Sequence, residues 1–225
     1  MQKISDRYDS FIFDWDGTIV SLTPIRKADA RFDFKISFRK GKERKNRNFS
    51  IKNEDVESNL YKVYRKSIGR IKDAEHNFKN RLETFALDII LRFVKPRLHN
   101  GVLEVLKELD KKNKEIAVFS DGNLNRLLKE VEILKIENYF TAILSAQSVG
   151  KLKPNPLGIE ILIKSMNCKK ERTLYIGDMV DDVDAARNAG ISSCAIAGGF
   201  NTYEDLKNSN PDYLFGSMEE FEKNL

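Results

Sequence analysis

The chain has 225 residues, of which 41% are hydrophobic and 32% are charged, and its formal net charge is +5. This length fits one large domain or two modest ones, and the composition is typical of a globular protein with a charge-rich surface. No apolar run approaches the roughly 20 residues needed to cross a bilayer, and the polar start differs from a secretory signal. The two cysteines, Cys168 and Cys194, lack metal-ligand spacing, so we expect a cytoplasmic protein without a zinc site or a disulfide framework.

The first predicted element is a short strand over residues 9–13, followed by the sequence DWDGT at residues 14–18. Strand alternation places Asp14 and Asp16 on the same side of the chain, and Gly17 allows a sharp turn. Two carboxylates at this spacing repel each other. We therefore expect a cation or a shared proton between them.

Residues 21–95 differ from the rest of the chain in charge and in pattern. They hold 20 Lys/Arg and 10 Asp/Glu, whereas the remainder holds 19 and 24. Apolar residues at helical spacing predict amphipathic helices over 54–71 and 73–94, and Pro96 marks the end of the second. The excess of positive charge indicates either a basic surface that faces an anionic partner or a solvated charged face.

The start of this basic region has two interpretations. Apolar residues alternate with polar ones over 31–39, which is typical of a half-exposed strand. A turn at 41–43 would pair this strand with 48–51, so that 31–51 forms a hairpin. The alternative is a flexible basic loop, because 39–47 is nearly all polar.

Beyond Pro96, short apolar runs alternate with amphipathic helical patterns. The predicted strands are 116–119, 142–144, 173–176 and 193–196, and the predicted helices are 101–112, 123–134, 155–166 and 182–189. This alternation predicts an α/β fold with a mostly parallel sheet. Ligands of such sheets bind beyond the carboxyl ends of the strands, which is where Asp14, Ser120 and Asp178 fall.

Three of these segments carry groups suited to binding a phosphate and a metal. Ser120 is followed by the backbone N–H groups of Asp121 and Gly122 at the start of a predicted helix, a place that favours anions. Lys153 can neutralise the charge of a phosphoryl group and of an attacking carboxylate. A further pair of carboxylates, Asp178 and Asp182, follows the fourth strand, and carboxylate oxygens suit Mg²⁺.

Taken in order, these segments resemble the four motifs of the haloacid dehalogenase (HAD) superfamily. The first motif is DWDGT, the second is Ser120, the third is Lys153 before a proline, and the fourth is GDMVDD over 177–182. The resemblance implies a Rossmann-like core formed by residues 1–19 and 97–225. It also implies a mainly helical cap domain over 20–96, similar to the caps of phosphoglycolate phosphatases.

The resemblance implies a catalytic role for each motif. Asp14 would attack phosphorus and form an aspartyl-phosphate, while Asp16 would protonate the leaving oxygen and then activate water. Ser120 and the N–H groups near Asp121 would bind the phosphoryl oxygens, and Lys153 would orient the nucleophile.

The same resemblance implies a magnesium site. Asp14, the backbone carbonyl of Asp16, and Asp178 would hold Mg²⁺, with Asp182 supporting the site through water or hydrogen bonds.

Asp16 also narrows the reaction, because phosphatases and phosphomutases of this superfamily have an aspartate at this position and dehalogenases and phosphonatases lack it. We predict a phosphatase that acts on a small phosphorylated metabolite. One alternative is a phosphomutase. Another is a module that binds nucleic acid or protein through the basic cap; the presence of every expected core residue disfavours it.

Overall fold

The computed structural model describes residues 3–21 and 95–225, and within them the fold is built on a six-stranded sheet. The strand order is β3-β2-β1-β4-β5-β6, and every neighbouring pair is parallel. The strands are β1 (Ser10–Phe13), β2 (Glu115–Ser120), β3 (Ala142–Ser145), β4 (Thr173–Gly177), β5 (Ser192–Ile196) and β6 (Tyr213–Phe215). The predicted α/β fold with a parallel sheet is confirmed.

Helices connect the strands and cover both faces of the sheet. The longer ones are α5 (Val102–Lys111), α6 (Leu124–Leu134), α8 (Leu157–Ser165) and α9 (Val180–Ala189), close to the four predicted ranges. The shorter ones are α1 (Ile4–Arg7), α7 (Ala146–Val149), α10 (Tyr203–Asn208) and α11 (Met218–Lys223), with 3₁₀ turns η2 (Glu137–Tyr139) and η3 (Lys170–Arg172). These short helices were not predicted, because four to six residues are too few to show a helical pattern, and β6 has only three residues.

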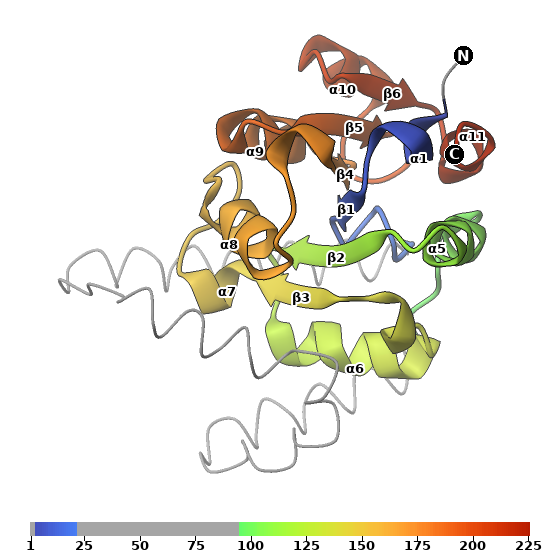
Figure 1. Ribbon diagram of the computed structural model, residues 1–225, viewed down its shortest axis with the longest axis vertical. Coiled ribbons are helices and arrows are strands. Elements are labelled where there is room, and N and C mark those ends of the chain that lie inside the picture. Colours follow the sequence, from blue (N-terminus) through green and yellow to red (C-terminus); the bar gives the residue numbers. More distant parts are fainter. Residues whose placement is uncertain (1–2, 22–94) are drawn as a thin grey trace, which may run out of the picture.

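Strand alternation divides the apolar side chains between two layers of core. Phe11 and Phe13 pack with α5, α6 and α11 on one face, while Ile12 packs with α8 and α9 on the other. Figure 1 shows α5 and α11 on one side of the sheet and α8 and α9 on the opposite side. Because both faces are covered, the strands are continuous apolar runs and not alternating ones.

The chain leaves the core after β1 and re-enters it at the same place. The Ser21 N–H donates to the Arg97 carbonyl at 2.8 Å, and the His99 N–H donates to the Ile19 carbonyl at 2.9 Å. The predicted cap is the segment of chain between the two stretches that these hydrogen bonds join, 19–21 and 97–99. Its helices over 54–71 and 73–94, and the hairpin or basic loop within 31–51, lie outside the described residues. In the two described ranges, none of the helices has the length and apolarity of a membrane span.

Candidate active site

The site lies at the carboxyl edge of three adjacent strands, β2, β1 and β4. Asp14 directly follows β1, Ser120 is the last residue of β2, and Asp178 directly follows β4. The Asp14 N–H donates to the Ile176 carbonyl at 2.8 Å, which joins the ends of β1 and β4. Parallel pairing therefore brings together motif residues that are more than 50 positions apart in sequence.

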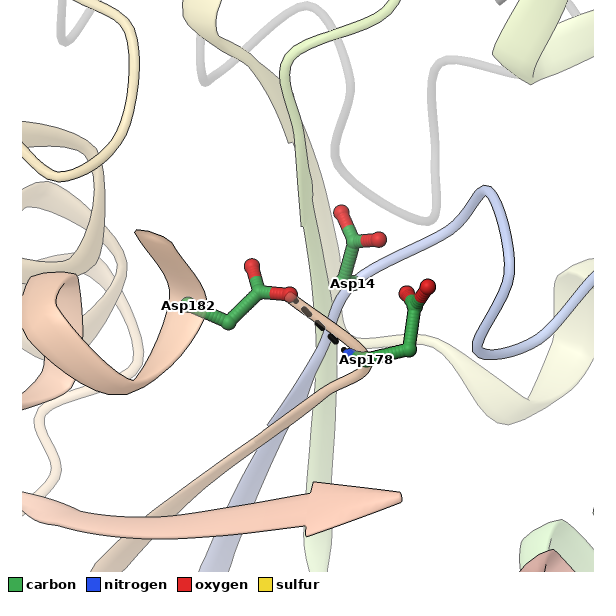
Figure 2. Close-up of side chains that lie close together, drawn as sticks. All are labelled: Asp14, Asp178 and Asp182. Atoms are coloured by element: carbon green, nitrogen blue, oxygen red, sulfur yellow. Dashed lines mark hydrogen bonds between the residues drawn. The ribbon is translucent and has the colours of Figure 1, made fainter. Parts of the chain in front are cut away.

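Three buried carboxylates form the centre of the site. Asp14, Asp178 and Asp182 each offer an oxygen, and these oxygens lie within 4.8 Å of one another. Figure 2 shows Asp178 beside Asp14, with the Asp182 carboxylate on the other side. The Lys153 Nζ donates to Asp14 Oδ1 and to Asp182 Oδ1, both at 2.6 Å. One ammonium among three carboxylates leaves an excess of negative charge, which a divalent cation would neutralise.

The donor set fits Mg²⁺ on chemical grounds. Hard oxygen ligands from one or two carboxylates, completed by water and a substrate phosphate, are what this ion prefers. Two glycines leave room for the Asp178 carboxylate itself: a Cβ on Gly17 would lie 2.3 Å from Asp178 Oδ2, and a Cβ on Gly199 would lie 1.8 Å from the same atom. Gly17 also has a φ of +92°, a conformation that other residues rarely adopt.

The buried position of these groups changes their acidity. Desolvation, together with the nearby Asp182 carboxylate, raises the pKa of Asp178 to about 7. Desolvation also raises the pKa of Asp14, and the Lys153 ammonium opposes that rise. Desolvation alone lowers the pKa of Lys153, but Asp14 and Asp182 outweigh it, so the pKa of this lysine is raised well above its usual value. The two neighbouring carboxylates therefore favour the charged form of Lys153.

Asp182 supports the other residues from the start of α9. Its Oδ2 accepts from the backbone N–H groups of Asp178 at 3.1 Å and of Met179 at 2.9 Å, and its Oδ1 accepts from Lys153. Asp178 is fixed separately, because Thr18 Oγ1 donates to its Oδ1 at 2.9 Å and the Phe200 N–H donates to its Oδ2 at 2.6 Å. Both oxygens of Asp182 thus already accept from neighbours, and its supporting role at the metal site stays a prediction.

Hydrogen bonds with side chains of β2 and β3 hold the loop that follows β2. The buried Ser120 Oγ accepts from the Gly122 N–H at 3.0 Å, and Ser145 Oγ donates to the Gly122 carbonyl at 2.6 Å. The Asp121 Oδ1 accepts from the Lys153 N–H at 3.1 Å, and desolvation raises the pKa of this carboxyl to about 6 although Lys153 opposes the rise. The Asp121 side chain thus connects the predicted phosphate loop to the backbone of the lysine.

Asp16 points to a different set of partners. Arg126, in the first turn of α6, donates from Nη1 to Asp16 Oδ1 at 2.9 Å and from Nη2 to Asp16 Oδ2 at 2.5 Å. Glu130 lies one turn further along α6, with its Oε2 3.4 Å from Arg126 Nη1, and it accepts from the indole Nε1 of Trp15 at 2.6 Å. The Asp16 carboxylate is not part of the carboxylate cluster, and its predicted metal contact through the backbone carbonyl stays a prediction.

Sequence reasoning missed Arg126 and Glu130. The available signal was their i, i+4 spacing beside the apolar positions Leu127 and Val131, which places a charged pair next to the buried face of the helix. Such a pair is ordinarily a solvated ion pair on a helix surface. Here both residues are buried.

Comparisons with known proteins give a matching family and several relatives. A family model described as haloacid dehalogenase-like hydrolase matches residues 11–196. A phosphoglycolate phosphatase from Vibrio parahaemolyticus is 30% identical over 123 residues, which cover 55% of this chain and 54% of that protein. The pyrophosphatase PpaX from Listeria monocytogenes is 24% identical over 131 residues, 58% of each chain. The chain thus spans a little over half the length of these curated relatives.

Solved structures show the same fold. A predicted phosphoglycolate phosphatase from Haemophilus somnus has a TM-score of 0.62 at 21% identity, covering 96% of this chain and 97% of that one. A protein assigned as a β-phosphoglucomutase from Thermotoga maritima has a TM-score of 0.62 at 20% identity, with the same coverage. At these identities, the likeness concerns the fold alone.

Proposed function

Because the chain belongs to the haloacid dehalogenase-like hydrolase family, we propose that it is a Mg²⁺-dependent phosphatase that hydrolyses a small phosphomonoester through an aspartyl-phosphate on Asp14. The observation that carries this proposal is the buried cluster of Asp14, Asp178 and Asp182, in which the Lys153 ammonium pairs with Asp14 and Asp182. A carboxylate is a competent nucleophile toward phosphorus when its charge and orientation are controlled.

Asp14 performs the first half of the reaction. One of its carboxylate oxygens forms a bond to phosphorus while the ester P–O bond breaks, and the electron pair of that bond goes to the leaving oxygen. Asp16 gives a proton to this oxygen, so that an alcohol and not an alkoxide departs. In the second half, Asp16 takes a proton from the water that attacks phosphorus, and free phosphate leaves Asp14.

The surrounding residues hold the phosphoryl group and limit repulsion. Lys153 donates to Asp14 and so keeps one carboxylate oxygen fixed while the other faces the substrate. Ser120 and the backbone N–H groups of the loop after β2 bind the phosphoryl oxygens. Asp14, Asp178 and the backbone carbonyl of Asp16 would hold Mg²⁺, with Asp182 in support, and the ion would supply positive charge against the phosphoryl oxygens.

The relatives and the charge of the chain support the proposed substrate class. The curated relatives are a phosphoglycolate phosphatase and a pyrophosphatase, and both names describe small phosphorylated compounds. The basic region over 39–47 favours a substrate with several negative charges. Phosphomutase activity is the alternative, and release of free phosphate from a sugar phosphate would exclude it.

The test is a panel of phosphomonoesters assayed for phosphate release with Mg²⁺ and with EDTA. We expect Mg²⁺-dependent turnover by the wild type and a loss on the order of 10⁴-fold or more in Asp14→Asn. Asp184→Asn, at a partly exposed aspartate on α9, serves as the matched control and keeps wild-type turnover. Turnover that survives in Asp14→Asn would overturn the proposed mechanism.

A further inference from the structure

A second buried polar network lies beside the nucleophile, and two segments of the chain each contribute two of its members. Trp15 and Asp16 come from the turn after β1, and Arg126 and Glu130 come from adjacent turns of α6. The contacts run from Trp15 Nε1 to Glu130, from Glu130 to Arg126, and from Arg126 to Asp16. Since Trp15 and Asp16 are neighbours in sequence, these contacts close a ring.

The ring fixes the Asp16 carboxylate more firmly than a single hydrogen bond would. Both oxygens of Asp16 accept from the two Nη atoms of one guanidinium, at 2.9 and 2.5 Å, so the plane of the carboxylate is defined as well as its place. The Trp15 indole, which anchors Glu130, has no exposed surface and packs edge-to-face against Phe140 with ring centroids 6.5 Å apart. The anchor therefore belongs to the rigid core.

The guanidinium also lies at the edge of the phosphoryl site. A Cβ placed on Gly122 would lie 2.5 Å from Arg126 Nη2, 3.2 Å from Ser120 Oγ and 3.4 Å from Asp16 Oδ2. The glycine thus allows the guanidinium to approach the loop that carries the predicted phosphate-binding serine. α6 brings Arg126 there because Asn123 caps the helix and accepts from the Arg126 N–H at 3.2 Å.

Stability alone does not account for this network. An ion pair taken out of water loses hydration that its Coulomb attraction does not fully replace, and a packed apolar pair is often as stable. Arg126 and Glu130 stand beside Leu127 and Val131, where α6 could carry further apolar side chains. Charged residues at such positions point to a task for the group that they hold.

We propose that Arg126 is a positioning residue that aims the Asp16 carboxyl group at the leaving oxygen of the substrate, and that Glu130 and Trp15 fix Arg126 in turn. This inference rests on the proposed function, in which Asp16 protonates the leaving oxygen; the protonated carboxyl group keeps one oxygen as an acceptor for Arg126 and turns its O–H toward the substrate. Misplacement of a catalytic group by about 1 Å can lower a rate about 100-fold, so a fixed orientation of the Asp16 carboxyl group should raise the rate of the proton transfer.

The test measures kcat/KM for a series of substituted phenyl phosphates, from p-nitrophenyl phosphate to phenyl phosphate, because this constant includes bond cleavage and excludes later hydrolysis of the phospho-enzyme. A p-nitrophenolate leaves readily without a proton, whereas phenolate needs one. In Arg126→Lys we expect a loss of about 10- to 100-fold for phenyl phosphate and about 2-fold or less for p-nitrophenyl phosphate. The dependence of kcat/KM on the leaving-group pKa therefore steepens.

Companion variants separate positioning from folding. Trp15→Phe keeps the ring packing but removes the donor to Glu130, and Glu130→Gln weakens the anchor; both should steepen the same dependence, though less than Arg126→Lys does. In an Asp16→Asn background, Arg126→Lys should have no further effect. Glu132→Gln, at an exposed position of α6, is the matched control and should behave as the wild type.

The outcomes are distinct. An equal loss of kcat/KM across the series in Arg126→Lys and Trp15→Phe, with an unchanged slope, would show a purely structural role and overturn this inference while leaving the proposed function intact. A wild-type enzyme that hydrolyses none of the esters with Mg²⁺ would overturn the proposed function, and this inference with it. Circular dichroism of each variant verifies folding; if Arg126→Lys does not fold, the slope for Trp15→Phe decides.

Discussion

The two ends of the central strands both carry ion pairs, but in opposite surroundings. At the amino end, Asp9 precedes β1 and pairs with Arg172 and Lys114; the Asp9 and Arg172 side chains are 55% and 41% exposed. At the carboxyl end, Lys153 pairs with Asp14 and Asp182, and none of these three side chains is more than 4% exposed. The same sheet therefore carries one solvated and one buried set of charges.

The difference in exposure between these two sets of ion pairs indicates which set contributes to function and which contributes only a little to stability. Solvated pairs contribute little, commonly less than about 1 kcal/mol, and removing them is tolerated. Buried charges lose several kcal/mol of hydration, so a buried cluster with three carboxylates and one ammonium is unfavourable by itself. The carboxyl ends of the strands therefore have the properties of a site that binds a cation and a phosphate, whereas the amino ends have those of an ordinary protein surface.

The largest effect should follow removal of the one ammonium from the buried cluster. In Lys153→Met, Asp14 and Asp182 lose their shared cation, and we expect the free energy of unfolding to fall by about 3 to 5 kcal/mol. Phosphatase activity should fall by about 100-fold or more, because the nucleophile loses its orientation. Urea denaturation in metal-free buffer measures the first effect.

Lys151→Met is the matched control for this change, since Lys151 lies in the same loop and is exposed. It should retain wild-type stability and activity. Equal stability of Lys153→Met and Lys151→Met would show that the two ends of the sheet do not differ in the way described.

A smaller effect of opposite sign should follow removal of a carboxylate. In Asp178→Asn, the Thr18 hydroxyl can turn to accept from the new amide, and the amide oxygen still accepts from the Phe200 N–H. Repulsion with Asp182 disappears, so we expect the metal-free variant to melt about 2 to 6 °C higher than the wild type, on the order of 1 to 2 kcal/mol.

Adding Mg²⁺ should reverse that ranking. The ion should raise the Tm of the wild type by binding the folded state, and should have little effect on Asp178→Asn. Differential scanning calorimetry with and without EDTA measures both. An identical Mg²⁺ response in the two proteins would remove Asp178 from the proposed metal site.

The smallest effect should be seen at the amino end. The hydrogen bond from Arg172 lowers the pKa of Asp9 to about 2, below its usual value near 3.8. A carboxyl with a lowered pKa in the folded state stabilises the fold above about pH 4, and this contribution is lost as the pH falls through about 2. Because Asp9 is largely solvated, Asp9→Asn should lower the free energy of unfolding at pH 7 by less than about 1 kcal/mol.

Unfolding of both proteins in urea across pH 2 to 7 measures this contribution. The difference between wild type and Asp9→Asn should shrink toward zero at the acid end, and added salt should reduce it at pH 7. Phosphate release at pH 7 should be unchanged. A large loss of activity in Asp9→Asn would mean that the amino end contributes to the site after all.

The contrast between strand ends and helix side chains also explains which parts of the fold and of the site could be predicted from the sequence. The residues at strand ends could be predicted, because a short apolar run followed by Asp, Ser or Gly marks the end of a buried strand, and parallel strands place those ends together. Asp14, Ser120 and Asp178 are adjacent for this reason. The roles assigned to them depend on the family resemblance and await experiment.

Contacts made by helix side chains could not be predicted in this way. Arg126 and Glu130 have the spacing of an ordinary surface ion pair, and only the packing of α6 against Trp15 and Asp16 shows that they are buried. β6 was missed for another reason, because its apolar run of three residues, Tyr213–Phe215, is too short to be told from an isolated apolar cluster.

The most direct test of the account is to trap the phospho-enzyme. A labelled phosphomonoester is mixed with the wild type and Mg²⁺, the reaction is stopped with acid within milliseconds, and the peptides are mapped by mass spectrometry. We expect the phosphoryl group on the peptide that contains Asp14, and no labelled peptide from Asp14→Asn. Full-rate phosphate release with no labelled protein, or a label on another residue, would contradict the account.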